Sequence, residues 1–525
     1  MHHTDASHLD CDLLVVGGGI NGVGIARDAV GRGLSVVLCE KDDLAQHTSS
    51  ASTKLIHGGL RYLEYYEFSL VRKALLEREV LLRMAPHIMW PLRFVMPHDR
   101  SQRPAWMIRA GLFLYDHLAR RRFLPGSEAV RLAQHPAGGP LKPGFARGFV
   151  YSDGWVDDAR LVVLNARDAA DRGAQILTRT RCLNAECRAD GWHASLAGPD
   201  GIRSVRAKAI VNAAGPWAAE FARAAHALPD TRGLRLIKGS HIIVRRMFDH
   251  PFAYIFQNPD GRIVFAIPYQ DDFTLIGTTD LEYTGPLDQV AIDAGEIDYL
   301  CEMANRYFAR QLTPADVVWN YSGVRPLLDD SAASASAITR DYLVECETGA
   351  DGRAAPLINV WGGKITTYRK LAEEALDKLA PHLPAAGAPS WTATAALPGG
   401  DLEVPGQLVG QYTFADFVTR LQKRLPWLPA RLAKRYAHQY GTRVTTLLAG
   451  AARLDDLGAE VTPGLYEAEI RYLIEYEWAR TAQDILWRRT KLGLYAAEAD
   501  RGRLEAWLTR HPPTVEADPE ALRAP

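Results

Sequence analysis

Cysteine is scarce in this sequence, because only six occur in 525 residues and they form no C-x-x-C pair and no metal-ligand spacing. This pattern indicates free thiols in a reducing compartment rather than a disulfide framework, and it predicts no metal site. The chain also lacks an uninterrupted apolar run of about 18 residues, which argues against a transmembrane helix. Its polar N-terminal stretch contains no apolar segment typical of a secretory signal.

An excess of charge of one sign is lacking too, since the formal net charge is -1 at pH 7. No global field therefore attracts the chain to nucleic acid, and we expect no such partner. The length exceeds that of an ordinary single core and predicts two or three domains.

What the sequence does contain is a G-x-G-x-x-G motif at residues 17–22, directly after the apolar run Leu13–Val16. A helical pattern follows, and then a second apolar run, Val36–Leu38, which is succeeded two residues later by Glu40. The glycines allow a tight turn and close approach to a pyrophosphate, and the acid can accept hydrogen bonds from ribose hydroxyls. We therefore predict a βαβ unit that binds a dinucleotide.

The binding unit begins near residue 12 but is completed only near residue 380, with a β-rich insertion between. Helical periodicity marks 64–84 and 159–173, whereas 241–280 holds short apolar runs separated by turns, which indicates an antiparallel sheet. Two-domain flavoproteins are often interrupted in this way, and nicotinamide dehydrogenases usually are not. Because only one dinucleotide fingerprint occurs, a small reduced substrate is a better electron donor than NAD(P)H.

We predict an α/β fold in which a discontinuous dinucleotide-binding domain interleaves with an antiparallel-sheet substrate domain, followed by an all-helical C-terminal cap domain. Residues 91–149, punctuated by Pro and Arg, are interpreted as an excursion from the core, and 386–400 as a linker. The C-terminal remainder shows helical periodicity and no strand signal. The predicted boundaries are 1–90, 150–240 and 335–385 for the binding domain, 241–334 for the sheet domain and 401–525 for the C-terminal domain.

Seven sequence motifs between residue 12 and about residue 380 resemble those of one protein family. They read GGGINGVGIARDAVGRGLSVVLCE, SSASTKLIHGGLRYLEYYEFSLV, RPAWMIRAGLFLYDHL, VNAAGPW, FTLIGTTD, YSGVRPLL and NVWGGKITTYRKLAEEAL. In these motifs the chain resembles the FAD-dependent glycerol-3-phosphate dehydrogenases, especially the bacterial aerobic enzymes that feed electrons to quinone. The resemblance implies a glutathione-reductase-like FAD domain, noncovalent FAD, and oxidation of sn-glycerol 3-phosphate to dihydroxyacetone phosphate.

The resemblance also implies which residues bind the cofactor. Hydroxyls and backbone N–H groups of a Ser/Thr-rich loop would follow the extended FAD, and a helix N-terminus after Gly362 would face the electron-rich edge of the flavin, favouring its reduced form. The predicted cofactor-binding residues are Gly17, Gly19, Ile20, Asn21, Gly22, Glu40, Thr48, Ser49, Ser50, Ser52, Lys54, His57, Gly58, Cys182, Ala213, Gly215, Trp217, Gly363, Lys364, Ile365 and Thr366.

Basic residues in separate family motifs predict a small anionic substrate. Arginine forks suit phosphate oxygens, because two parallel N–H bonds fix both charge and orientation. From the resemblance we assign Arg340 and Lys364 to the phosphate, with a weaker hydroxyl contact from Tyr62. Arg61 and Arg325 are placed nearer the C2 hydroxyl, where Arg325 would stabilise the developing carbonyl oxygen charge.

Alcohol oxidation by flavin needs a base, and His57 is the predicted one, because a neutral imidazole suits proton abstraction near neutral pH. The alternative is a histidine that only hydrogen-bonds flavin or backbone. An arginine as base is chemically poor, since its pKa exceeds 12.

A quinone acceptor requires contact with a bilayer. Residues 103–124 combine Trp106, Met107, Leu112, Phe113 and Leu114 with several arginines, a composition that suits a helix lying on anionic headgroups. The alternative is an amphipathic helix packed on its own domain. We predict a cytoplasmic homodimer, peripherally attached to the inner face of the cytoplasmic membrane.

Three other functions remain open from the sequence. One is an oxidase of the same fold that returns electrons to oxygen, and another is an amine-oxidising flavoprotein, which the cluster of cations disfavours. The third is a non-catalytic flavin-binding protein, in which substrate would not bleach the flavin.

Overall fold

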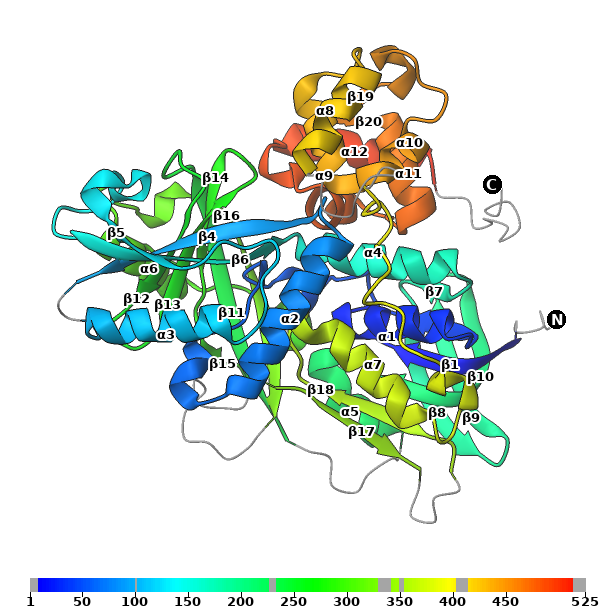
Figure 1. Ribbon diagram of the computed structural model, residues 1–525. Coiled ribbons are helices and arrows are strands. Elements are labelled where there is room, and N and C mark those ends of the chain that lie inside the picture. Colours follow the sequence, from blue (N-terminus) through cyan, green and yellow to red (C-terminus); the bar gives the residue numbers. More distant parts are fainter. Residues whose placement is uncertain are drawn as a thin grey trace.

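The computed structural model describes residues 8–99, 102–225, 233–328, 341–348, 354–402 and 414–512. Two sheets with packed helices form the body of the molecule, and a mainly helical C-terminal domain lies across one end (Figure 1). Within those ranges, none of the helices is both long and apolar enough to cross a bilayer.

The first sheet has eight strands and contains the predicted dinucleotide-binding unit. Its main path runs β17-β18-β10-β1-β2-β7, in which β18, β10, β1, β2 and β7 are parallel and β17 is an antiparallel edge. The strands are β1 (His8–Val16), β2 (Val36–Cys39), β7 (Gln175–Leu177), β8 (Arg181–Arg188), β9 (Gly191–Gly198), β10 (Gly201–Asn212), β17 (Leu343–Glu347) and β18 (Leu357–Trp361).

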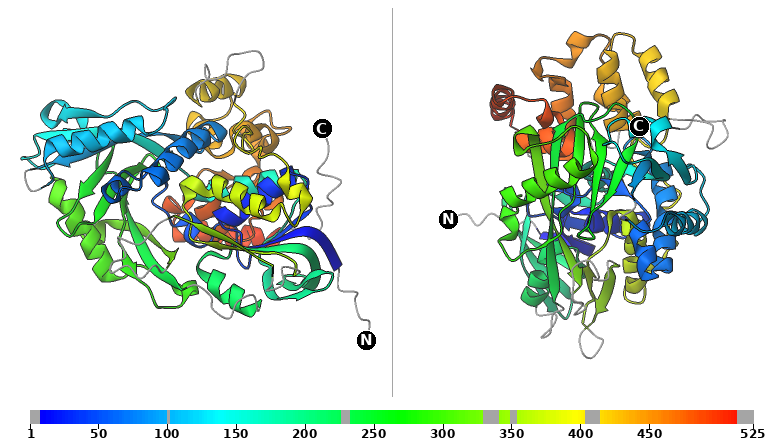
Figure 2. Two further views of the ribbon diagram at one scale, coloured as in Figure 1. Left: turned by 60° about the horizontal axis from the view of Figure 1, so that its bottom comes forward. Right: turned by 90° about the vertical axis from the view of Figure 1, so that its left-hand side faces the viewer.

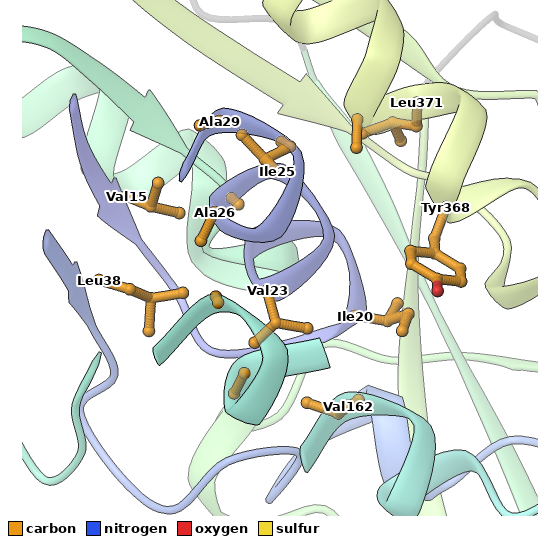
Figure 3. Close-up of a cluster of buried hydrophobic side chains, with 14 of the residues drawn as sticks. Val15, Ile20, Val23, Ile25, Ala26, Ala29, Leu38, Val162, Tyr368 and Leu371 are labelled. Atoms are coloured by element: carbon orange, nitrogen blue, oxygen red, sulfur yellow. The ribbon is translucent and has the colours of Figure 1, made fainter. Parts of the chain in front are cut away.

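Helices α1 (Ile20–Gly31), α4 (Asp158–Asp171) and α7 (Tyr368–Leu379) build the core against this sheet. Figure 3 shows Val23 and Ala26 of α1 beside the strand residues Val15 and Leu38, with Tyr368 of α7 on the other side of the helix. A Cβ at Gly24 would come within 2.7 Å of the Tyr368 ring, so this glycine lets α1 and α7 pack closely. The core thereby joins segments more than 300 positions apart and holds the motif at residues 17–22.

The second sheet has ten strands, with a main path β15-β11-β14-β13-β12-β4-β6-β3. It is antiparallel except between β12 and β4. Its strands are β3 (Leu55–Ile56), β4 (Met89–His98), β5 (Glu128–Arg131), β6 (Arg147–Val156), β11 (Leu234–Arg245), β12 (Ala253–Gln257), β13 (Ile263–Tyr269), β14 (Phe273–Gly277), β15 (Leu281–Glu282) and β16 (Val317–Leu328).

This sheet is wider than the 241–334 range expected for it. Residues 91–149 were interpreted as an excursion, yet β4 lies inside the sheet between β12 and β6, and Phe94 and Val95 belong to its core. The Pro and Arg residues obscured the strand pattern because Pro91 and Pro97 occupy positions in β4 itself. Helices α2 (Phe68–Met84), α3 (Ala105–His117), α5 (Ala218–Ala224) and α6 (Ala294–Tyr307) complete the body.

The C-terminal domain is mainly helical, as expected, but it also contains a short hairpin that the sequence did not signal, β19 (Glu460–Thr462) and β20 (Leu465–Tyr466). Its helices are α8 (Phe414–Arg424), α9 (Ala430–Tyr440), α10 (Val444–Leu447), α11 (Glu467–Glu477), a π-helix at Asp484–Arg489 and α12 (Glu498–Arg510). Figure 2 shows this domain, coloured yellow-orange to red, from two further directions. It is tied to helix α4 through Arg160–Glu477 and to the turn between β13 and β14 through Arg431–Asp272.

Candidate active site and cofactor cavity

A cavity of about 280 Å³, here called the first cavity, lies at the carboxyl ends of β1 and β2. Its walls come from the glycine-rich turn, the loop after β2, the start of β8, and the segment after β10. Ligands of open α/β sheets bind at this end of the strands. The predicted cofactor residues that line it are Gly17, Gly19, Glu40, Thr48, Ser49, Cys182, Ala213, Gly215 and Trp217.

The glycine-rich turn has no room for side chains. A Cβ at Gly22 would lie 1.9 Å from the carbonyl oxygen of Gly17, and one at Gly17 would lie 2.4 Å from that of Ala213. Gly17 also has φ of +115°, which L side chains rarely adopt. The backbone itself therefore forms this wall of the first cavity.

Glu40 closes the far side of the turn, where its carboxylate accepts hydrogen bonds from the backbone N–H of Gly18 (2.6 Å) and of Asp42 (2.9 Å). Burial raises the pKa of this carboxyl, although the two backbone donors partly oppose the shift. The side chain is 8% exposed and lies in the wall of the cavity, where a sugar hydroxyl can reach it.

The Ser/Thr-rich loop is held by helix α1 and by the second sheet. Ser49 Oγ accepts from the Ile20 N–H at the start of α1 (3.0 Å), and Thr48 donates to the Val324 carbonyl of β16 (2.7 Å). These bonds place the loop between the first cavity and the second sheet.

Ser52 and Lys54 lie away from the residues that line the first cavity. Both bind Asp158 at the start of α4, with Lys54 Nζ 2.6 Å from one carboxylate oxygen and Ser52 Oγ 2.8 Å from the other. Lys54 also donates to the Ser50 carbonyl (3.1 Å) and is only 2% exposed. These two side chains hold the loop against α4, and they line neither of the two cavities described here.

The start of α1 meets the turn after β18. Asn21 Nδ2 donates to the Gly362 carbonyl (3.1 Å), while its buried Oδ1 has no hydrogen-bond partner among the described residues. Gly363 has φ of +106°, and its Cβ would lie 2.9 Å from Asn21 Nδ2. Ile365 and Thr366 then begin a 3₁₀ turn that leads into α7. Two chain segments that carry predicted cofactor residues thus come together.

A second cavity, of about 430 Å³, lies against the second sheet. His57, Arg61, Tyr62 and Arg325 all line it, although they come from two distant parts of the chain. Lys364 lies beside this group, with Nζ 3.8 Å from the centre of the Tyr62 ring. Five of the six residues predicted to bind or transform substrate therefore lie together. The sixth, Arg340, lies outside the described residues.

Arg325 is oriented by an acid. Its Nη2 donates to Asp280 Oδ1 (2.8 Å), and both side chains are partly accessible, at 31% and 18%. Asp280 also lines the second cavity. The pair holds the guanidinium at the cavity edge, where a ligand can still reach it.

A buried network supports the main chain at His57. The N–H of His57 donates to Thr366 Oγ1 (3.2 Å), and that of Gly58 donates to the Tyr115 hydroxyl (2.8 Å). Tyr115 in turn donates to Asp153 (2.8 Å), which also pairs with the buried Arg78. These bonds hold the peptide groups on either side of His57 in place.

Comparison with known proteins places this geometry in a family. The family described as FAD dependent oxidoreductase matches residues 12–369, and the C-terminal domain of alpha-glycerophosphate oxidase matches residues 390–509. The chain belongs to the FAD-dependent oxidoreductases. Both the family and the fold expected from the sequence are confirmed.

Several relatives share about half their residues with this flavoprotein. A glycerol-3-phosphate dehydrogenase of Pseudomonas aeruginosa is 54% identical over 95% of this chain and 96% of its own length. A D-erythritol 1-phosphate dehydrogenase of Brucella abortus is 51% identical, over 95% and 97%. A crystal structure of the glycerol-3-phosphate dehydrogenase from Bacillus halodurans, complexed with FAD, has a TM-score of 0.76 at 26% identity and covers 98% of this chain and 93% of that one.

The residues of this flavoprotein fit FAD. The first cavity offers a glycine cradle, where the backbone of Gly17 and Gly19 carries no side chain, the N-terminus of α1 for phosphates, and the buried Glu40 for a ribose. The Asn21 Oδ1 atom without a partner marks a polar position between this cradle and the turn at Gly362. The cofactor is FAD, as predicted.

Sequence reasoning missed the acids and the tyrosine that orient the site. Asp280 lies three residues after β14, inside a motif already noted, and an acid next to a strand end was the available signal. Asp153 carried no signal, because residues 150–240 were assigned to the dinucleotide-binding domain and β6 was not recognised as a strand of the second sheet. Tyr115 was missed because α3 was interpreted only as a helix that lies on a membrane or packs on its own domain.

His241 was also missed. It is buried on β11, contacts Thr53 Oγ1 (2.9 Å) and stacks on Tyr321. Burial lowers its pKa well below the ordinary value, and the nearby cations Lys54 and Arg325 add to that shift. This imidazole is therefore neutral at neutral pH.

Proposed function

We propose that this protein oxidises sn-glycerol 3-phosphate to dihydroxyacetone phosphate and passes the electrons to a membrane quinone. The observation that carries the proposal is the convergence of His57, Arg61, Tyr62 and Arg325 on one cavity, with Lys364 beside them. A base and several cations in one cavity suit a phosphorylated alcohol and would serve an amine cation poorly.

The chemistry divides between cofactor and protein. FAD supplies, when bound, an acceptor for the hydride that leaves C2 of the alcohol. His57 accepts the proton of the C2 hydroxyl, so that the C–O bond becomes a carbonyl while two electrons leave with the hydride. Arg325 donates hydrogen bonds to the same oxygen and stabilises its negative charge as the proton departs. Thr366 and the Asp153 network keep the His57 segment fixed during the reaction.

The phosphate is held by the remaining cations. Lys364, which lies against the Tyr62 ring, and Arg340 would neutralise it, with a hydroxyl contact from Tyr62. Arg61 would bind nearer the C2 hydroxyl. Because each charge-assisted hydrogen bond is worth about 1.5–3 kcal/mol, a non-phosphorylated alcohol should bind far more weakly.

The test is an anaerobic titration of the purified holoenzyme, followed by flavin absorbance. Glycerol 3-phosphate should bleach the flavin at micromolar to millimolar concentration, and glycerol should not. Equal reduction by both compounds would contradict the phosphate site. D-erythritol 1-phosphate belongs in the same experiment because of the similar relative. A strong preference for it would keep the phosphate site and replace the proposed substrate.

An oxidase is the second candidate, because the C-terminal match is to a domain of alpha-glycerophosphate oxidase. Stopped-flow mixing of the substrate-reduced protein with oxygen or with a soluble quinone separates the two functions. A dehydrogenase should be reoxidised rapidly by quinone and slowly by oxygen. The reverse order would establish the oxidase.

Helix α3 supports attachment to a membrane surface. Trp106 is 70% exposed and Phe113 57%, and Tyr66, in the segment that packs beside α3, is 80% exposed. Leu112, which the sequence placed in the membrane-facing set, is only 1% exposed and belongs to the core instead. Exposed aromatic side chains near arginines are suited to the interface of an anionic bilayer.

Vesicle sedimentation tests this attachment. Wild-type protein should pellet with phosphatidylglycerol vesicles, and the double variant Trp106→Ser/Phe113→Ser should stay mostly in the supernatant. Ile202→Ser is the control, because Ile202 is also an exposed apolar residue (60%) but lies on β10 of the first sheet, away from α3. Retention of the double variant on vesicles at the wild-type level would exclude α3 as the anchor.

A further inference from the structure

The π-helix of the C-terminal domain contacts the segments that form the wall of the first cavity. Asp43, in the loop after β2, is fully buried and accepts two hydrogen bonds from Arg489 (both 2.8 Å) as well as one from Arg488. The same loop supplies five residues that line the cavity, namely Glu40, Lys41, Ala45, Gln46 and His47. One segment of the wall of the cofactor site is therefore fastened to residues about 445 positions away in the sequence.

The same helix also contacts a second, adjoining segment of the cavity wall, residues 179–182. Asp484 accepts a hydrogen bond from Arg179 Nη2 (2.7 Å), and the Arg179 N–H donates to the Asp42 carbonyl (2.8 Å). The next residue, Thr180, lines the cavity, and its N–H donates to the Glu40 carbonyl (2.7 Å). Asp484 thus ties the segment that leads to Cys182 to the loop that carries Glu40.

The charges in this contact are shielded from water. Arg489 and Asp43 have side chains with 0% exposure, and that of Asp484 has 1%. Burial raises the pKa of Asp484, but Arg488 and Arg179 more than offset this and bring it to about 2. Because buried charges tolerate little displacement of their partners, the ion pairs fix the distance between the π-helix and both wall segments.

We propose that Asp484, Arg488 and Arg489 are positioning residues of the FAD site, which hold both wall segments around the adenosine half of the cofactor. The C-terminal domain would then control how long FAD stays bound, without touching the substrate. This inference rests on FAD binding alone and not on the identity of the substrate or of the electron acceptor.

A matched control distinguishes this positioning role from a general stabilisation of the interface between the C-terminal domain and the body. Arg160 and Glu477 form an equally buried ion pair between α4 and α11, across the same interface. Neither residue lines the first cavity or bonds to the two wall segments. Glu477→Gln preserves the Glu477 carbonyl that Arg489 also contacts.

The experiment measures FAD release from diluted full-length holoenzyme by the rise of flavin fluorescence, alongside the thermal midpoint. Asp484→Asn and Arg489→Met should each release FAD at least tenfold faster than wild type. Glu477→Gln should release FAD at the wild-type rate even though it lowers the midpoint by a similar amount. Arg489→Lys, which keeps the charge but not the fork, should fall between Arg489→Met and wild type.

Wild-type release rates in both Asp484→Asn and Arg489→Met would overturn the proposal, as would equally fast release in Glu477→Gln. Two positioning variants keep the test decisive if one of them fails to fold. Since no substrate is added, a failure of the proposed function leaves this measurement intact.

Discussion

The first and second cavities adjoin the same loop, residues 48–62, but they are built by different means. The first includes glycine backbone at the turn after β1, where added side chains would clash, and one buried acid. The second is walled by long cationic and aromatic side chains that stay partly accessible. A backbone site depends on close packing and a side-chain site depends on charge, so the two should fail under different substitutions.

The largest effect on FAD content is expected for Gly22→Ala, because its added Cβ disturbs the packing of the turn beside the first cavity. Its Cβ would lie 1.9 Å from the Gly17 carbonyl oxygen, so α1 must move away from the turn. We expect loss of most bound FAD and a cost of about 1–3 kcal/mol in unfolding free energy. Flavin absorbance per protein and a denaturant titration measure the two effects.

Gly111→Ala is the control, because a Cβ at this helical position meets no atom within 4 Å. It should retain FAD and raise the stability by up to about 1 kcal/mol. Full flavin content in Gly22→Ala would show that close packing at the turn is not needed.

A smaller and purely kinetic effect is expected for Arg325→Met in the second cavity. Loss of the donor to the developing oxyanion should lower kcat/KM by about 10²–10³. Flavin content and melting temperature should stay at wild-type values, since the side chain is 31% exposed and adds little to the core. Steady-state assays with a soluble quinone measure the loss. Arg325→Lys should recover part of the lost kcat/KM. Loss of flavin in either variant would contradict the prediction that the second cavity can be altered without weakening FAD binding.

The smallest effect is expected from titration of Glu40. Burial raises the pKa of this carboxyl, so it takes up a proton at a higher pH than an exposed glutamate does. The protonated form loses an acceptor for the ribose, and FAD affinity should therefore fall as pH decreases through that raised pKa. Fluorescence titrations between pH 7 and pH 4.5 would follow the change.

Glu40→Gln should bind FAD about tenfold more weakly at pH 7 and lose most of this dependence on acid, since charged hydrogen bonds are the stronger ones. An unchanged acid profile in Glu40→Gln would assign the titration to another group.

Much of the first cavity could be predicted from the sequence, because the turn, α1 and β2 with Glu40 are contiguous and each residue acts through local geometry. Strands with alternating or continuous apolar patterns were found for the same reason, such as β13 and β18. β4 was missed because prolines and arginines masked its pattern, and its place in the sheet depends on partners distant in the chain.

The candidate substrate residues were predicted one by one, from motifs, but not their supporting contacts. Asp280 beside Arg325 and the Asp153–Tyr115 pair behind Gly58 come from strands and a helix whose alignment no local pattern contains. Leu112 is a further example. Helical periodicity alone did not show which face of α3 is buried, so the sequence wrongly placed Leu112 on the exposed face.

By itself the sequence determined the dinucleotide turn, the helical character of the C-terminal domain and the family to which the chain belongs. Those features depend on neighbouring residues and on conformations that single residue types favour or forbid. Only the tertiary structure decided that His57, Arg61, Tyr62 and Arg325 line one cavity and that Arg489 forms an ion pair with Asp43. Such pairings arise from the burial of charges and apolar faces contributed by distant segments, and a linear pattern carries no record of that geometry.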